Sequence, residues 1–171
     1  MTSSALLRPL LLGVATGMRS QLGLAVLAWS EPAGPGDPAV LRGLRSPVGR
    51  VALGLAAAGE VVVDKLPSTP SRLKPPVLGA RLVTGAAVGA LAAGSADRRA
   101  RGTAAVLGLA GAAAGTYAGA HSRRAAAARG TLPDLPFAVV EDAVAAGLAA
   151  TAVKVWPQPR PWWKRLPFTS R

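Results

Sequence analysis

The sequence predicts an all-α fold, a polytopic bundle of about five transmembrane helices, and three observations lead to that prediction. Half of the 171 residues are hydrophobic, and the mean hydropathy is +0.34. The apolar residues gather in blocks close to the roughly 20 residues that a helix needs to cross a bilayer. The basic residues lie mostly between these blocks, as they do at membrane surfaces. We therefore expect a multi-pass protein of the cell membrane.

The first two blocks, residues 9–29 and 47–66, are separated by a connection rich in Pro and Gly. The first contains one charge, Arg19, and the second contains Glu60 and Asp64 near its end. A cleaved signal peptide is an alternative for the first block, but the polar triplet that begins with Arg19 interrupts the apolar core of such a peptide. We therefore expect two membrane-spanning helices here.

The other three blocks are residues 76–96, 102–120 and 136–156. The middle one is uncharged, whereas the last contains the adjacent acids Glu141 and Asp142. A strand of a transmembrane barrel would alternate apolar and polar residues, and these blocks do not alternate. Blocks that begin with Pro suit a helix start, where the missing backbone N–H would have no partner in the helix. Each block is therefore expected to be a helix.

The charge pattern divides the chain into a transmembrane helical domain, residues 1–156, and a basic tail, residues 157–171, which contains Trp162 and Trp163. Trp rings favour the headgroup layer of a bilayer, and Arg and Lys favour lipid phosphates. The formal net charge of +12 therefore predicts contact with anionic lipid headgroups. It does not indicate nucleic acid, because the basic residues lie in short groups beside apolar blocks, without interleaved aromatic residues.

Glycine recurs at every fourth position on three of the predicted helices, which places the Gly residues of each helix on one face. Such faces let two helix backbones approach closely in a membrane. Packing within one chain and a homodimer contact are both consistent with this pattern. The residues are Gly13 and Gly17, Gly85 and Gly89, and Gly111, Gly115 and Gly119.

The chain offers little chemistry for catalysis or metal binding. It contains no Cys, and its one His, His121, has no second His or Cys with which to build a metal site. The sequence contains no P-loop, dinucleotide-binding glycine fingerprint, zinc motif or catalytic triad pattern. We therefore expect no enzymatic activity, no metal and no cofactor.

Four of the eight acidic residues lie inside the predicted helices, where a charge costs about 2.5–3.5 kcal/mol at the helix centre. Glu60 and Asp64 are four residues apart and share one helix face. They lie near a helix C-terminus, where the dipole disfavours negative charge. They therefore need a cation, a proton or water, and the expected partner is Arg19, with Arg81 as the second candidate.

The other acidic pair, Glu141 and Asp142, lies near a helix N-terminus, where the dipole favours acids. Because adjacent residues point about 100° apart on a helix, one partner is not expected to serve both. Arg123 and Arg124 stand before the preceding connection and are candidates to meet one of them.

The order of these charges indicates an internal repeat. The first and second blocks combine a basic residue, Arg19, with a later acidic pair that begins at Glu60. The fourth and fifth blocks combine Arg123 and Arg124 with an acidic pair that begins at Glu141. Because three spans separate the starts of the two halves, we expect the second half to be inverted in the membrane, as in many transporters.

Three short motifs stand out along the chain. They are Glu60-x-x-x-Asp64-Lys65-x-Pro67, residues 15–20 (Ala-Thr-Gly-Met-Arg-Ser), and Gly79-Ala80-Arg81 with residues 85–86. Together they resemble a family of small bacterial integral membrane proteins that is catalogued as a domain of unknown function. The resemblance covers about residues 6–153 and leaves the basic tail outside. It implies a membrane location and brings no established activity.

Two functional hypotheses follow from the charges inside the blocks. In the first, a small cation, a proton or a polar solute crosses the membrane along a path lined by Arg19, Glu60, Asp64 and Glu141. In the second, the chain is a non-transporting scaffold or assembly subunit, held by internal ion pairs and by Gly and Ala helix packing. The other residues of the predicted polar set are Lys65, Arg81, Arg123, Arg124 and Asp142.

Overall fold

The computed structural model describes residues 3–30, 34, 36–63, 73–94, 97–129 and 134–154. Within this part of the chain the fold is all-α, as predicted, with seven helices and no strand. The helices are α1 (Ser3–Met18), α2 (Leu22–Ser30), α3 (Ala39–Arg45), α4 (Pro47–Val63), α5 (Pro75–Ala92), α6 (Arg98–Arg129) and α7 (Asp134–Lys154). The predicted basic tail, residues 157–171, lies outside the described residues.

The first apolar block does not form the single helix that the sequence predicts. α1 ends, a short turn follows, and α2 runs back along α1. A Cβ atom placed on Gly23 would lie 3.0 Å from the carbonyl oxygen of Leu12, whereas eleven residues of straight helix would separate the two by roughly 16 Å. The predicted span of residues 9–29 is therefore a helical hairpin. We call the three residues of its turn, Arg19, Ser20 and Gln21, the hairpin tip.

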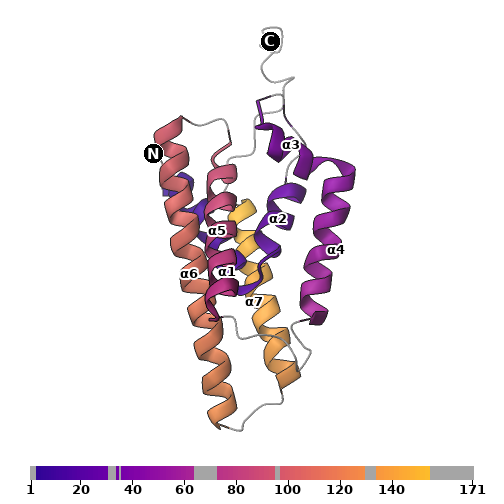
Figure 1. The fold of residues 1–171 in the computed structure, drawn as a ribbon, viewed down its shortest axis with the longest axis vertical. Helices are drawn as coiled ribbons and strands as arrows, with labels where there is room; N and C mark the ends of the chain where they lie inside the picture. The colour runs from indigo at the N-terminus through magenta and orange to yellow at the C-terminus, as the bar shows by residue number, and fades with distance from the viewer. Residues whose placement is uncertain are drawn as a thin grey trace, which may run out of the picture.

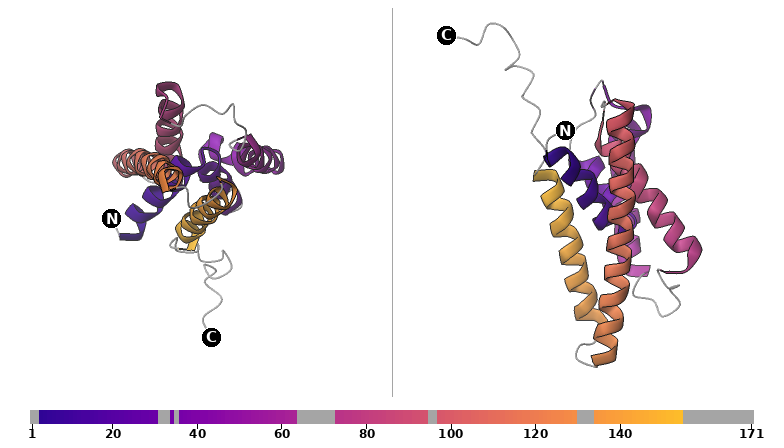
Figure 2. Two further views of the ribbon diagram at one scale, coloured as in Figure 1. Left: turned by 90° about the horizontal axis from the view of Figure 1, so that it is seen from below. Right: turned by 90° about the vertical axis from the view of Figure 1, so that its left-hand side faces the viewer.

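The four long helices, α4 to α7, alternate in direction and surround this hairpin (Figures 1 and 2). α4 runs back beside α2: Trp29 Nε1 donates a hydrogen bond to the carbonyl oxygen of Arg50 (3.2 Å), and Arg50 Nε donates one to that of Ala28 (3.0 Å). The short α3 lies at one end of the bundle, where Arg45 Nη1 is 2.6 Å from Asp37 Oδ2. The hairpin thus occupies the centre of the molecule.

Glycine brings α6 into backbone contact with both α1 and α5. A Cβ atom on Gly108 would lie 2.2 Å from the carbonyl oxygen of Gly85, and one on Gly13 would lie 2.2 Å from the carbonyl oxygen of Gly108. Cβ atoms do not approach a backbone so closely, so a larger residue would push the helices apart. These glycines pack within one chain. We call them the glycine seam: Gly13, Gly17, Gly85, Gly89, Gly108, Gly111 and Gly115.

The direction of α1 overturns the predicted inverted repeat. Along the seam Gly13 contacts Gly108 and Gly17 contacts Ala112, so residue numbers rise together and α1 is parallel to α6. An inverted repeat would make the first and fourth apolar blocks antiparallel. The physical reason is the hairpin, because the first block returns to the side from which it starts and so removes one crossing of the bundle.

Two helices in the described part of the chain are long and apolar enough to cross a membrane. They are Pro75–Ala92, which is all of α5, and Arg98–Ala125, which is most of α6. Length and composition therefore identify two of the five predicted spans, and the first of the five is the hairpin. The third and fourth apolar blocks of the sequence fall on these two helices.

Candidate polar site at the hairpin tip

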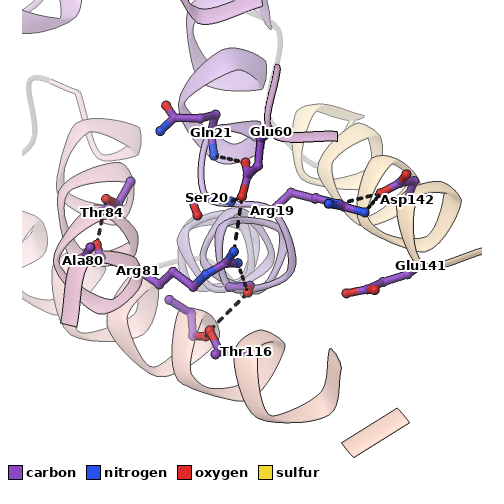
Figure 3. Close-up of polar contacts among 12 residues, drawn as sticks. Arg19, Ser20, Gln21, Glu60, Ala80, Arg81, Thr84, Thr116, Glu141 and Asp142 are labelled. Atoms are coloured by element: carbon purple, nitrogen blue, oxygen red, sulfur yellow. Dashed lines mark hydrogen bonds and ion pairs between the residues drawn. The ribbon is translucent and has the colours of Figure 1, made fainter. Parts of the chain in front are cut away.

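The N–H groups at the start of a helix have no partner within that helix, and those before α2 are bound by a side chain of α4. Glu60 accepts hydrogen bonds from Ser20 N through Oε1 (2.7 Å) and from Gln21 N through Oε2 (2.9 Å) (Figure 3). A carboxylate is a strong acceptor here, because the positive end of the helix dipole adds to the attraction. Glu60 is therefore a cap for α2 that comes from about 40 residues further along the chain.

The carbonyl group of Gly17, near the end of α1, is bound by side chains of α5 and α6. Arg81 Nη1 of α5 donates a hydrogen bond to Gly17 O at 2.7 Å, and Thr116 Oγ1 of α6 lies 3.1 Å from the same oxygen. Arg81 Nη2 also lies 3.3 Å from Glu60 Oε1. One buried guanidinium therefore links the end of α1 to the cap of α2, as the several donors of Arg allow.

A second ion pair joins the hairpin tip to α7. Arg19 Nε and Nη2 each lie 2.5 Å from Asp142 Oδ1. The Arg19 side chain is 4% exposed and the Asp142 side chain is 26% exposed, so the carboxylate is the more accessible partner. This pairing corrects the expectation that Arg19 serves Glu60. That role belongs to Arg81, because the hairpin turns Arg19 toward α7.

The neighbouring acid, Glu141, leaves α7 on a different side and pairs with α6. Arg123 Nε donates a hydrogen bond to Glu141 Oε2 at 2.8 Å, and the Glu141 side chain is buried. Adjacent helical residues point about 100° apart. Asp142 accordingly meets the hairpin (Figure 3), while Glu141 meets Arg123 of α6. Arg124, the other predicted basic candidate, is exposed on the surface of α6.

Cavities lie on both sides of α7. The larger, of about 410 Å³, opens beside the hairpin tip, between α2, α4 and α7. The smaller, of about 230 Å³, includes Glu141 in its lining and lies between α1, α6 and α7. The larger one, which we call the tip cavity, is lined by Arg19, Glu60 and Asp142 and by the apolar Leu22, Ala57, Ala58 and Ala146. Alanine on α4 and α7 leaves this space open, because longer side chains there would fill it.

The structure brings together four of the nine predicted polar residues and separates others. Arg19, Glu60, Arg81 and Asp142 meet at the hairpin tip, and Arg123 and Glu141 form their own pair. Asp64 and Lys65 lie outside the described residues. Sequence reasoning missed Thr116. The feature that could have identified it is a hydroxyl group inside an uncharged, apolar block. Sequence reasoning also missed the alanines of the cavity, which carry no signal in a chain this rich in Ala.

The pairing of charges limits what the site can bind. No group of three or more His, Asp and Glu side chains within the described ranges could hold a metal ion. The carboxylates of the tip are instead bonded to guanidinium and backbone N–H groups.

Comparisons of the chain with protein-family models, with curated proteins and with solved structures find no match. The resemblance to a family of small bacterial membrane proteins therefore stays a prediction.

Proposed function

We propose that this chain is a multi-pass membrane protein that carries a small polar solute or ion through the tip cavity. In this proposal α4 to α7 cross the bilayer, and the hairpin of α1 and α2 enters it and returns to the same side. The shortest of the four crossing helices, α4, has 17 residues. At 1.5 Å per residue it is about 25 Å long, close to the roughly 30 Å of a hydrocarbon core.

The distribution of side chains supports the membrane location. Large apolar side chains lie exposed on the long helices, while Arg19, Arg81 and Glu141 are buried. Soluble proteins seldom expose broad apolar surfaces. A helix bundle in lipid exposes its apolar side chains and turns its charged groups toward the interior, as this one does. The exposed apolar residues include Val51 and Leu55 on α4, Val83 on α5, Val106 and Leu109 on α6, and Val139 and Val140 on α7.

The hairpin tip beside its cavity is the observation that carries the transport proposal. Non-helical backbone at membrane depth is tolerated only where protein buries it or where it lines a polar cavity. Broken helices whose ends meet a cavity form the binding sites of many transporters. In this chain Glu60 and Arg81 bind the backbone of the turn, and Arg19 lines a cavity of about 410 Å³.

A non-transporting scaffold is the second candidate, and the ion pairs favour it. Glu60 is bonded to Arg81, Asp142 to Arg19, and Glu141 to Arg123. Each pair joins two different elements of the bundle, as expected if the charges only lock helices together. The scaffold and transport functions differ in one measurable property, the presence of water in the tip cavity, because only a transport path needs it.

Cysteine labelling tests the proposal, since the natural chain has no Cys. Ala57 lines the tip cavity, whereas Leu55, two residues earlier on α4, is 69% exposed and does not line it. In vesicles that contain the protein, a thiol reagent that cannot pass through lipid should modify Ala57→Cys quickly and Leu55→Cys slowly. Slow modification at both positions would overturn transport and favour the scaffold. Fast modification at both would overturn the membrane location of α4.

A further inference from the structure

We infer that the solute path of this protein bends around α7 and joins the tip cavity to the smaller cavity of about 230 Å³, which we call the second cavity. This inference rests on the proposed function and adds to it a second part of the path and a gate. The gate is the Arg19–Asp142 ion pair, which closes the passage between the two cavities in this structure. The residues shared out between the cavities, a line of charged side chains and the place of the second cavity in the bundle each support it.

The two cavities are lined by sequence neighbours. Arg19 and Asp142 line the tip cavity, whereas Met18 and Glu141 line the second cavity. At the end of α1 and on α7, one step along the chain therefore leads from one cavity to the other. These residues lie where the end of α1 packs on α7. The wall between the cavities is thin at this place, and the contact between Arg19 and Asp142 is part of it.

Charged side chains follow one another around α7 from the second cavity to the tip cavity. Arg123 is bonded to Glu141, and the next residue in the sequence is Asp142. Asp142 is in turn bonded to Arg19. The Arg123 side chain is 35% exposed and that of Arg19 is 4% exposed, so this line leads from the surface to the interior. Ionisable groups inside a membrane are costly, and those that occur commonly mark ion and solute pathways. A polar solute would find charged partners along the whole passage.

The second cavity lies near the end of the bundle where α6 leads into α7. Its lining residues fall between 118 and 122 on α6 and between 140 and 144 on α7, whereas the tip cavity is lined further along α7, at Asp142 and Ala146. The hairpin tip points toward the same end of the bundle (Figure 1). In a membrane, the second cavity would therefore lead to the face opposite the one from which the hairpin enters. It is the part of the path that connects the tip cavity to that face.

Opening the gate tests this path. The Ala57→Cys protein is placed in vesicles, and a charged methanethiosulfonate that cannot pass through lipid is added to one side at a time. Arg124→Cys, which is exposed near the end of α6, identifies the side on which α6 leads into α7. From that side, Asp142→Asn should speed the labelling of Ala57→Cys about fivefold, because an ion pair of about 1 kcal/mol no longer holds the passage closed. From the other side, the rate should stay unchanged.

Filling the second cavity should cancel this increase. Ala118 lines the second cavity, whereas Ala114, one turn earlier on α6, is exposed and does not line it. In the Asp142→Asn protein, Ala118→Leu should return the labelling of Ala57→Cys to its original rate, and Ala114→Leu should have no effect. Ser122→Leu fills the same cavity one turn later and should act as Ala118→Leu does. Thermal unfolding in detergent identifies any variant that has not folded.

The outcomes separate this path from its alternatives. An increase that is confined to the side of the α6–α7 connection and is cancelled by Ala118→Leu or Ser122→Leu supports it. An equal increase from both sides, no increase from either side, or an increase that remains when the second cavity is filled would overturn it. The proposed function fails separately, because in that case Ala57→Cys is labelled slowly from both sides before any gate residue is changed.

Discussion

The two sides of the bundle are held together in different ways. On one side, the glycine seam brings the backbones of α1, α5 and α6 into direct contact. On the other side, α2, α4 and α7 meet through ion pairs and hydrogen bonds around a cavity of about 410 Å³. Seam contacts leave no room for a side chain, whereas the charge contacts border an open space. The first side is therefore a rigid frame, and the second is the side where we propose that a solute binds.

The largest effect is expected in the crowded frame, at Gly108. A Cβ atom there would lie 2.2 Å from the carbonyl oxygen of Gly85, so Gly108→Ala should force α5 and α6 apart. The expected loss is about 3 kcal/mol of unfolding free energy, the upper part of the range for overpacking. Gly102, on the same helix, has nothing within 4 Å of its Cβ position, and Gly102→Ala should stabilise by about 0.5–1 kcal/mol. Unfolding in mixed micelles measures both, and equal effects would refute the rigid frame.

The next largest effect is expected at the cap of α2. Glu60→Gln removes the charge that binds Ser20 N, Gln21 N and Arg81, and should reduce stability by about 2 kcal/mol, as for other hydrogen bonds to charged groups. A double-mutant cycle with Arg81→Gln should show a coupling energy of at least about 0.5 kcal/mol. The same cycle with Arg19→Gln should show a smaller one. A larger coupling to Arg19 would reverse the assignment of partners at the tip.

A smaller effect on stability is expected from Asp142→Asn, on the side of the cavity. The Asp142 side chain is 26% exposed, and Asn keeps an acceptor oxygen for the buried Arg19, so the loss of the negative charge should cost about 1 kcal/mol. The rate of labelling at Ala57→Cys should nevertheless rise, because Arg19 is then freed from Asp142 and the tip loosens. A large loss of stability with no change in labelling would indicate a structural lock and would favour the scaffold.

The smallest effect on stability is expected at Arg124. Its neighbour Arg123 should have a larger effect. Arg124 is exposed, and Arg124→Gln should change the unfolding free energy by less than about 0.5 kcal/mol. Arg123→Gln, which removes the partner of the buried Glu141, should cost about 1 kcal/mol or more. The two variants have the same charge and differ by one position, so each is the control for the other. Equal effects would mean that the Arg123–Glu141 pair contributes nothing.

The sequence predicts the helical class and much of the frame, but not the direction of the first block. Apolar blocks and Gly at every fourth position indicate helices that pack closely, and Gly13, Gly17, Gly85 and Gly89 all lie in the seam. A hydropathy profile does not distinguish an apolar block that forms one straight helix from a block that turns back as a hairpin. The turn depends on Glu60 and Arg81, which lie about 40 and 64 residues from the groups that they bind.

Partners in the polar site were predictable where local geometry decides them. The divergence of Glu141 and Asp142 follows from the helical angle between neighbours, and Arg123 was one of two candidates for Glu141. The partner of Glu60 was not predictable to the same degree. Arg19 is the deepest cation in a straight first span, but the hairpin moves it to Asp142 and leaves Arg81 at Glu60.

The hairpin also has a consequence for the order of events during synthesis. A ribosome makes α1 and α2 first, yet the groups that bind the turn belong to α4 and α5. If the helices cross a bilayer as proposed, Arg19 and the N–H groups of the turn keep their contacts with water until those helices are made, because lipid offers them none. The hairpin is therefore expected to stay at the bilayer surface at first and to insert last, between helices that have already assembled.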